Sequence, residues 1–85
     1  MDPWRIDDFC GALMSLSART VEAYGSDLRG FAEWCGRSGL DDPDAVRRTT
    51  VRRYLAFLTT RRFARRTIAR KVASLRRYYR WATTH

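Results

Sequence analysis

An apolar stripe runs through the most basic stretch of this sequence. Residues 61–81 read RRFARRTIARKVASLRRYYRW, with nine Arg or Lys and no Asp or Glu. The apolar positions in and just after this stretch are spaced by four, three, four and three residues: Ile68, Val72, Leu75, Tyr79 and Ala82. This is the period of an α-helix with one buried face. A disordered basic tail has no reason to keep such a stripe, so the stretch is predicted to be an amphipathic helix.

Three more helices are predicted upstream. The first begins at Asp2-Pro3, an N-cap followed by a proline that suits the first turn. The second begins at Ser17 and stops at Gly39, and the third begins at Thr49 or Thr50. Apolar residues follow each start at helical spacing: Ile6, Phe9, Cys10 and Leu13; then Val21, Tyr24, Leu28, Phe31 and Cys35; then Val51, Tyr54, Leu55 and Leu58.

Length and composition favour one small folded domain. The 85 residues are 45% hydrophobic, which is too apolar for a disordered chain and enough for one modest core. No strand pattern is present, so the fold class is all-α: a compact four-helix bundle over residues 1–85. No apolar run approaches the roughly 20 residues that span a bilayer. The acidic N-terminus is unlike a signal peptide, and the chain is predicted to be cytoplasmic.

The charge is strongly segregated along the chain. Residues 1–44 hold four basic and nine acidic residues, a net charge of −5, whereas residues 45–85 hold thirteen basic residues and no acid. Such a field attracts polyanions. Sixteen of the seventeen cations are Arg, whose planar fork suits phosphate oxygens and guanine edges. A polyanion, such as a nucleic acid, is therefore the predicted partner.

Metal, cofactor and catalytic chemistry find little support in the sequence. Cys10 and Cys35 fall on apolar helical faces with no CxxC, and His85 is the single histidine, so no zinc set and no cofactor are expected. The tyrosines stand at helical spacing, where aromatic residues usually serve packing. A tyrosine nucleophile would need cations and an acid around a scissile phosphate. The chain is therefore predicted not to be an enzyme.

Two other functions fit parts of the pattern. A basic amphipathic helix can lie on a membrane surface, and a basic face can bind an acidic protein partner. The membrane function is less favoured because three other amphipathic helices can bury the stripe by mutual packing. The protein-interaction module stays open as the alternative to DNA binding.

Two motifs carry a resemblance to a known family. Residues 17–31 match the pattern Ser-x-x-Thr-x-x-x-Tyr-x-x-Asp-Leu-x-x-Phe, and residues 67–81 match Thr-Ile-x-Arg-Lys-x-x-x-Leu-Arg-x-Tyr-Tyr-x-Trp. The matching residues are Ser17, Thr20, Tyr24, Asp27, Leu28 and Phe31, then Thr67, Ile68, Arg70, Lys71, Leu75, Arg76, Tyr78, Tyr79 and Trp81. In this order and at this separation they resemble the core-binding domain of tyrosine recombinases of the Xer and phage-integrase type.

The resemblance implies a SAM-like domain of two crossed helical hairpins. In that family it forms one jaw of a clamp around duplex DNA, and a separate C-terminal domain holds the catalytic groups. The chain is accordingly expected to be a fragment of a longer recombinase that forms a tetrameric synapse on DNA, and to be monomeric in isolation. Three positions depart from the family: a glycine is common near Arg62 or Phe63, Ser or Asp is common at Ala64, and a basic residue is common at Gly25.

Charge, helical position and the resemblance together give a set of predicted DNA contacts. In the fourth helix, Arg66, Arg70 and Arg77 are placed opposite the apolar stripe, with Lys71 and Ser74 beside them. The N-terminal turn of the fourth helix adds backbone N–H donors for phosphate. The resemblance implies backbone contacts at the N-terminus of the second helix as well. The predicted contacts are Ser17, Arg19, Thr20, Arg65, Arg66, Thr67, Arg70, Lys71, Ser74 and Arg77.

Overall fold

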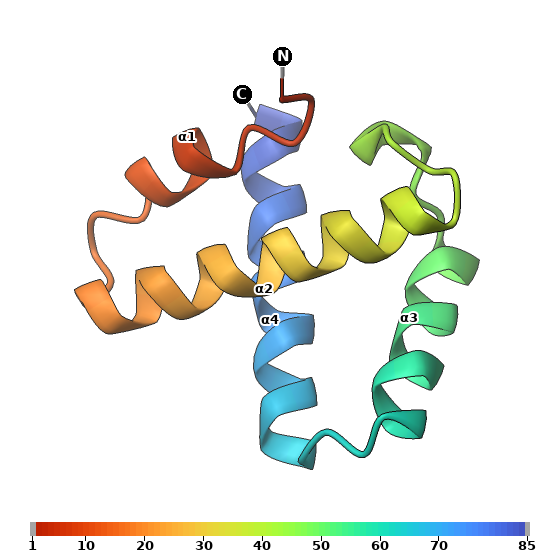
Figure 1. The fold of residues 1–85 in the computed structure, drawn as a ribbon. Helices are drawn as coiled ribbons and strands as arrows, with labels where there is room; N and C mark the ends of the chain where they lie inside the picture. Colours follow the sequence, from red (N-terminus) through yellow and green to blue (C-terminus); the bar gives the residue numbers. More distant parts are fainter. Residues whose placement is uncertain (1, 85) are drawn as a thin grey trace.

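A computed structural model describes residues 2–84, and these residues form four α-helices and one 3-10 helix, with no strand among them. In chain order the elements are α1 (Ile6–Gly11), α2 (Ala18–Arg37), η1 (Pro43–Ala45), α3 (Arg48–Thr60) and α4 (Arg65–Thr84). Figure 1 shows α2 crossing α4 steeply, with α1 and α3 on opposite sides of the crossing. The predicted all-α fold of two crossed hairpins is confirmed.

The start of α1 was predicted wrongly. The carboxylate of Asp2 accepts a hydrogen bond from the backbone N–H of Trp4 at 3.0 Å, which closes a local turn instead of capping the helix. Arg5 then adopts a left-handed backbone conformation with φ of 53°, and the helix begins after it. The Trp4 indole is 6% exposed and packs against other core rings. Burial of the Trp4 side chain therefore decides where the helix begins, although the local Asp-Pro pair favours an earlier start.

Both ends of α2 agree with the sequence prediction. The hydroxyl of Ser17 accepts the backbone N–H of Thr20 at 3.2 Å, as an N-cap does. At the other end, Gly39 has φ of +81°. The N–H groups of Gly39 and Leu40 donate to carbonyls of the last turn at 3.0 and 2.9 Å, the Schellman pattern.

The turn between α3 and α4 explains one departure from the family pattern. Arg62 has φ of 60°, in the left-handed region that glycine enters without a steric penalty. A glycine at this position would therefore adopt the same left-handed conformation that Arg62 adopts in this chain. Ala64 precedes α4 and has no side-chain acceptor, and its carbonyl accepts the first helical bond from Ile68 at 3.0 Å.

Aromatic side chains dominate the core. Tyr78 lies outside the apolar stripe predicted for the fourth helix, but it is 1% exposed, and its hydroxyl donates to the carbonyl of Trp4 at 2.6 Å. The buried face of α4 is thus rotated from the predicted stripe towards Tyr78, because α1 and α2 cover that side. The buried apolar residues are Trp4, Ile6, Phe9, Leu13, Leu28, Phe31, Cys35, Tyr54, Leu58, Leu75 and Tyr78.

The bundle covers part of the apolar stripe of α4. Leu75 is buried, and Ile68, Val72, Tyr79 and Ala82 are partly buried by the rest of the bundle. Within residues 2–84, no helix is both long and apolar enough to cross a bilayer.

Two of the three glycines inside α2, Gly25 and Gly30, have different surroundings. Gly25 is buried, and a Cβ at this position would lie 3.0 Å from Sγ of Cys10 and 3.2 Å from the Arg29 guanidinium. A Cβ at Gly30 would meet nothing within 4 Å. Gly25 therefore permits the close approach of α1 to α2, whereas Gly30 has no packing role.

We expect Gly30→Ala to raise the free energy of unfolding by about 0.5–1 kcal/mol, because alanine loses less backbone entropy in a helix. Gly25→Ala is the matched control and should give a smaller gain or a loss, since its methyl group crowds Cys10. Urea unfolding followed by circular dichroism at 222 nm measures both. Equal stabilisation by the two variants would contradict the close contact at Gly25.

Candidate nucleic-acid interface

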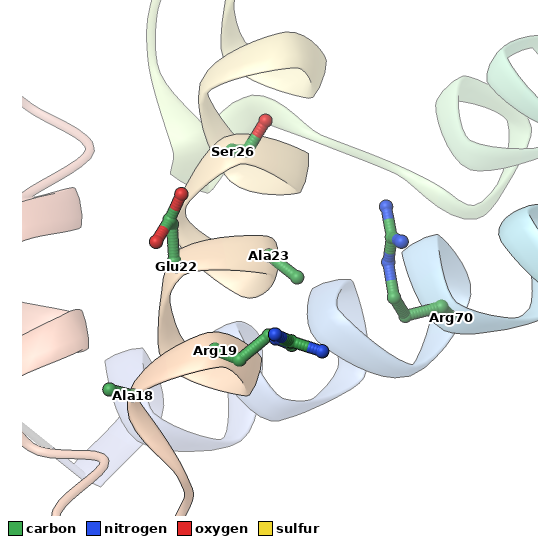
Figure 2. Close-up of a pocket in the computed structure, with 6 residues that line it drawn as sticks. All are labelled: Ala18, Arg19, Glu22, Ala23, Ser26 and Arg70. Atoms are coloured by element: carbon green, nitrogen blue, oxygen red, sulfur yellow. The ribbon is translucent and has the colours of Figure 1, made fainter.

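An open hollow lies where α2 and α4 approach each other. Its volume is about 500 Å³. In Figure 2, Arg19 extends from α2 towards α4, and Arg70 projects from α4 beside the same space. Ala18, Ala23 and Ser26 contribute short side chains to the hollow, and Glu22 adds a carboxylate. The lining residues are Ala18, Arg19, Glu22, Ala23, Ser26 and Arg70.

Arg19 differs from the other cations of the acidic half. Arg29 pairs with Asp7 at 3.1 Å, and Arg37 pairs with Glu33 at 2.9 Å. Arg5 similarly lies 3.5 Å from a carboxylate of the first helix. Within residues 2–84 no ion pair is found for Arg19, which leaves its charge available at the hollow.

The hydroxyl groups at the start of α2 serve the helix cap. Ser17 accepts the N–H of Thr20 and also donates its hydroxyl to Oγ1 of Thr20 at 2.9 Å. Ser17 is exposed and Thr20 is half-buried. Their position beside Arg19, at the positive end of the helix dipole, suits a phosphate. Contact of these two residues with DNA stays a prediction.

Arg70 is held by a buried carboxylate on the opposite helix. Asp27 is 2% exposed. Its Oδ2 accepts a hydrogen bond from Nε of Arg70 at 3.0 Å, and its Oδ1 accepts one from Nη2 at 2.7 Å. Arg70 is exposed, as its predicted place opposite the apolar stripe requires, with 44% of the side chain accessible. The contact of its guanidinium with Asp27 on α2 was not predicted.

This pair keeps Arg70 firmly charged. The hydrogen bond that Arg70 donates to the Asp27 carboxylate raises the pKa of Arg70, against the opposing effect of partial burial. A guanidinium has five N–H donors, and the two bonds to Asp27 leave three for a ligand. Arg70 therefore offers a cation whose plane is already fixed.

Ser74 and Lys71 are less accessible than predicted. Ser74 is 0% exposed, with its hydroxyl 2.8 Å from the carbonyl oxygen of Lys71 and 3.3 Å from Oδ2 of Asp27. This burial removes Ser74 from the candidate DNA contacts. Nζ of Lys71 bonds to Asp27 at 3.2 Å and lies over the ring of Phe63, with 13% of the side chain exposed. Both residues face α2 because the crossing of the helices covers this side of α4.

The remaining predicted residues fall into two groups along α4. Arg65 and Arg66 are exposed in its first turn, beside the half-buried Thr67. Arg77 is half-buried and borders a different groove, with Phe9 and other residues near α1. The structure therefore does not bring Arg77 to the hollow.

The tyrosines of the core have the properties of packing residues. Burial raises the pKa of Tyr54 and of Tyr78 to about 12, so both side chains stay neutral and protonated at ordinary pH. Tyr79 is partly buried, and its hydroxyl donates to the carbonyl of Pro43 at 3.1 Å. In the described part of the chain, no group of three or more His, Cys, Asp or Glu could hold a metal ion.

Comparison with known proteins identifies the family. Residues 6–85 match the family model described as phage integrase, N-terminal SAM-like domain. The chain belongs to this family. The domain recurs in curated relatives named tyrosine recombinase XerD and XerC, so the resemblance noted in the sequence is confirmed.

Three relatives show the extent of the match. The XerD recombinase of Shewanella oneidensis is 42% identical over 79 residues, which cover 89% of this chain and 26% of that protein. The XerD recombinase of Bifidobacterium longum is 33% identical over 72 residues, covering 85% and 23%. The XerC recombinase of Lacticaseibacillus casei is 41% identical over 68 residues, covering 79% and 23%.

The chain thus spans about a quarter of the length of the curated relatives that it matches. No solved structure matches it at the same level of significance.

Sequence reasoning missed the role of Asp27 in this SAM-like domain. Asp27 appeared only as a motif residue, yet Tyr24, Asp27, Leu28 and Phe31 occupy one helical face at steps of three, one and three. An acid within an apolar stripe is a signal for a buried partner of opposite charge. No comparable signal marks Glu22 or Ala23, which reach the hollow only through the crossing of α2 and α4.

Proposed function

We propose that this chain is the DNA-binding jaw of a site-specific tyrosine recombinase, contacting the major groove and backbone of a recombination half-site. One observation carries this proposal: Arg19 and Arg70, from crossing helices far apart in sequence, border one open hollow. The names of the relatives add support, since XerC and XerD are tyrosine recombinases.

The charge of the surrounding surface favours a polyanion. Arg65 and Arg66 are exposed at the start of α4, where the helix end adds N–H donors and a partial positive charge. Residues 45–85 have thirteen cations and no acid. The repulsion among these cations destabilises the folded chain unless a polyanion neutralises them. Duplex DNA supplies regularly spaced phosphates for such a surface.

In this proposal the chain binds DNA but does not cut it. Residues 1–85 act as a single domain that is monomeric alone, and the catalytic groups belong to another part of a longer recombinase. That recombinase forms a tetrameric synapse on DNA. The coverage of about a quarter of each relative supports the division of roles.

The test is the salt dependence of duplex binding. We expect a Kd on the order of 10⁻⁴ to 10⁻⁶ M near physiological salt, and a slope of log K against log salt of roughly −4 to −5. The double variant Arg19→Ala/Arg66→Ala should flatten the slope by about 2, because each lost phosphate contact removes about 0.9. Fluorescence anisotropy with a labelled duplex at several salt concentrations measures both quantities.

The matched control is Arg29→Ala/Arg37→Ala, which removes the same charge from residues already paired with acids. Its slope should stay close to that of the original chain. If both double variants lose affinity equally, general charge rather than this interface explains the binding. Tighter binding to a polyglutamate chain than to duplex DNA would instead favour an acidic protein partner.

A further inference from the structure

We propose that Asp27 is a positioning residue that makes Arg70 the base-reading cation of this interface. The inference rests on the proposed DNA binding and deepens it, because it separates one arginine that selects sequence from those that only attract phosphate.

The geometry fixes the guanidinium plane of Arg70. The Nε and Nη2 atoms bond to different oxygens of one carboxylate, at 3.0 and 2.7 Å. Paired, parallel bonds of this kind restrain both position and orientation. The carboxylate cannot move freely itself, since Asp27 is 2% exposed and also bonds to Lys71.

The donors that remain have the arrangement that a guanine edge requires. Because Asp27 occupies the Nε side of the guanidinium, the outer N–H groups of Nη1 and Nη2 form a second fork. Such a fork matches the O6 and N7 acceptors of guanine in the major groove. With 44% of the side chain exposed beside the hollow, this edge is accessible.

The negative charge of Asp27 indicates that the Asp27–Arg70 pair does more than attract phosphate. A buried carboxylate costs desolvation free energy and is weak evidence for stability. It also places a negative charge beside a surface that attracts phosphates. A neutral residue would serve non-specific binding better, whereas a charged bidentate partner is what holds a base-reading arginine in place.

The decisive variant is Asp27→Asn, which keeps the size of the side chain and removes its charge. Its affinity for duplexes of random sequence should rise by about twofold, because one repulsive charge near the DNA is lost. Its preference for guanine should fall, because the fork is no longer held. These changes have opposite signs, whereas damage to the fold would weaken all binding.

The measurement begins with selection of the chain on a pool of duplexes with a randomised centre. We expect a preferred guanine whose replacement weakens binding at least about fivefold. In Asp27→Asn and in Arg70→Lys this discrimination should drop to about twofold or less, since neither keeps a fixed fork. Arg66→Ala is the control and should weaken binding to all duplexes while keeping the preference.

A spectroscopic readout covers the case in which Asp27→Asn does not fold. In the unaltered chain, the Nε–H of Arg70 should exchange with water at least about tenfold more slowly than that of exposed Arg66. Equal exchange rates would overturn the positioning role. Retained guanine preference in Asp27→Asn, or no preference in the unaltered chain, would also overturn it. If the unaltered chain binds no duplex, the proposed function itself fails.

Discussion

Phe31→Ala is expected to lower the free energy of unfolding by about 3–5 kcal/mol. Phe31 is 0% exposed at the centre of the bundle. Its ring centroid lies 4.8 Å from that of Tyr54 and 5.7 Å from that of Trp4, so it joins α2 to α3 and to the N-terminal segment. Removing the ring leaves a cavity that these rigid neighbours cannot fill. The stability lost is therefore the free energy of transferring the ring from water into the core plus the cost of the cavity.

The effect is large relative to the stability of such a chain. At 85 residues, the whole free energy of unfolding is about 4–13 kcal/mol. Urea unfolding followed at 222 nm should therefore show an early transition or a largely unfolded variant at room temperature. Phe63→Ala is the matched control and should cost much less, because Phe63 is 42% exposed and its cation–π contact with Lys71 is worth about 1 kcal/mol or less. Equal losses in the two variants would contradict the described core.

Alkaline pH is expected to unfold the chain. Burial raises the pKa of Tyr54 and of Tyr78 from 10.0 to about 12, with nearby carboxylates adding to the effect, and burial raises the pKa of Cys35 from 9.0 to about 11. The folded state therefore keeps protons that the unfolded state loses. The stability from these groups is complete below the unfolded values of 9 to 10, and it is lost as the pH rises to 11 for Cys35 and 12 for the tyrosines.

Each pKa difference of this size corresponds to about 2–3 kcal/mol, so the groups together can remove most of the stability. Urea unfolding at several pH values between about 8 and 12, with tyrosinate absorbance recorded in parallel, measures the decline. Tyr54→Phe removes one titrating group and should reduce the decline by about 2–3 kcal/mol. A free energy of unfolding that stays constant across this range would show that these phenols are not buried.

The sequence by itself determined the elements whose signals are local. The 4-3-4-3 spacing around Leu75 predicts a helix because each residue advances by the same angle, whatever surrounds it. The cap at Ser17 and the stop at Gly39 involve atoms only a few residues away, so they too could be predicted. The segregation of charge that predicts a polyanionic partner is a property of composition and order, independent of the fold.

Only the tertiary structure decided which of those residues face one another. The burial of Trp4 overrode the Asp-Pro helix signal, because the contact with Phe31 comes from a distant segment. The crossing of α2 over α4 buried Ser74 and joined Asp27 to Arg70, 43 positions apart. Helical periodicity defines the faces of one helix, but the side on which another helix packs depends on how all the apolar faces fit together. That choice gave Arg70, which the sequence placed opposite the apolar stripe, a fixed partner in Asp27 on the facing helix.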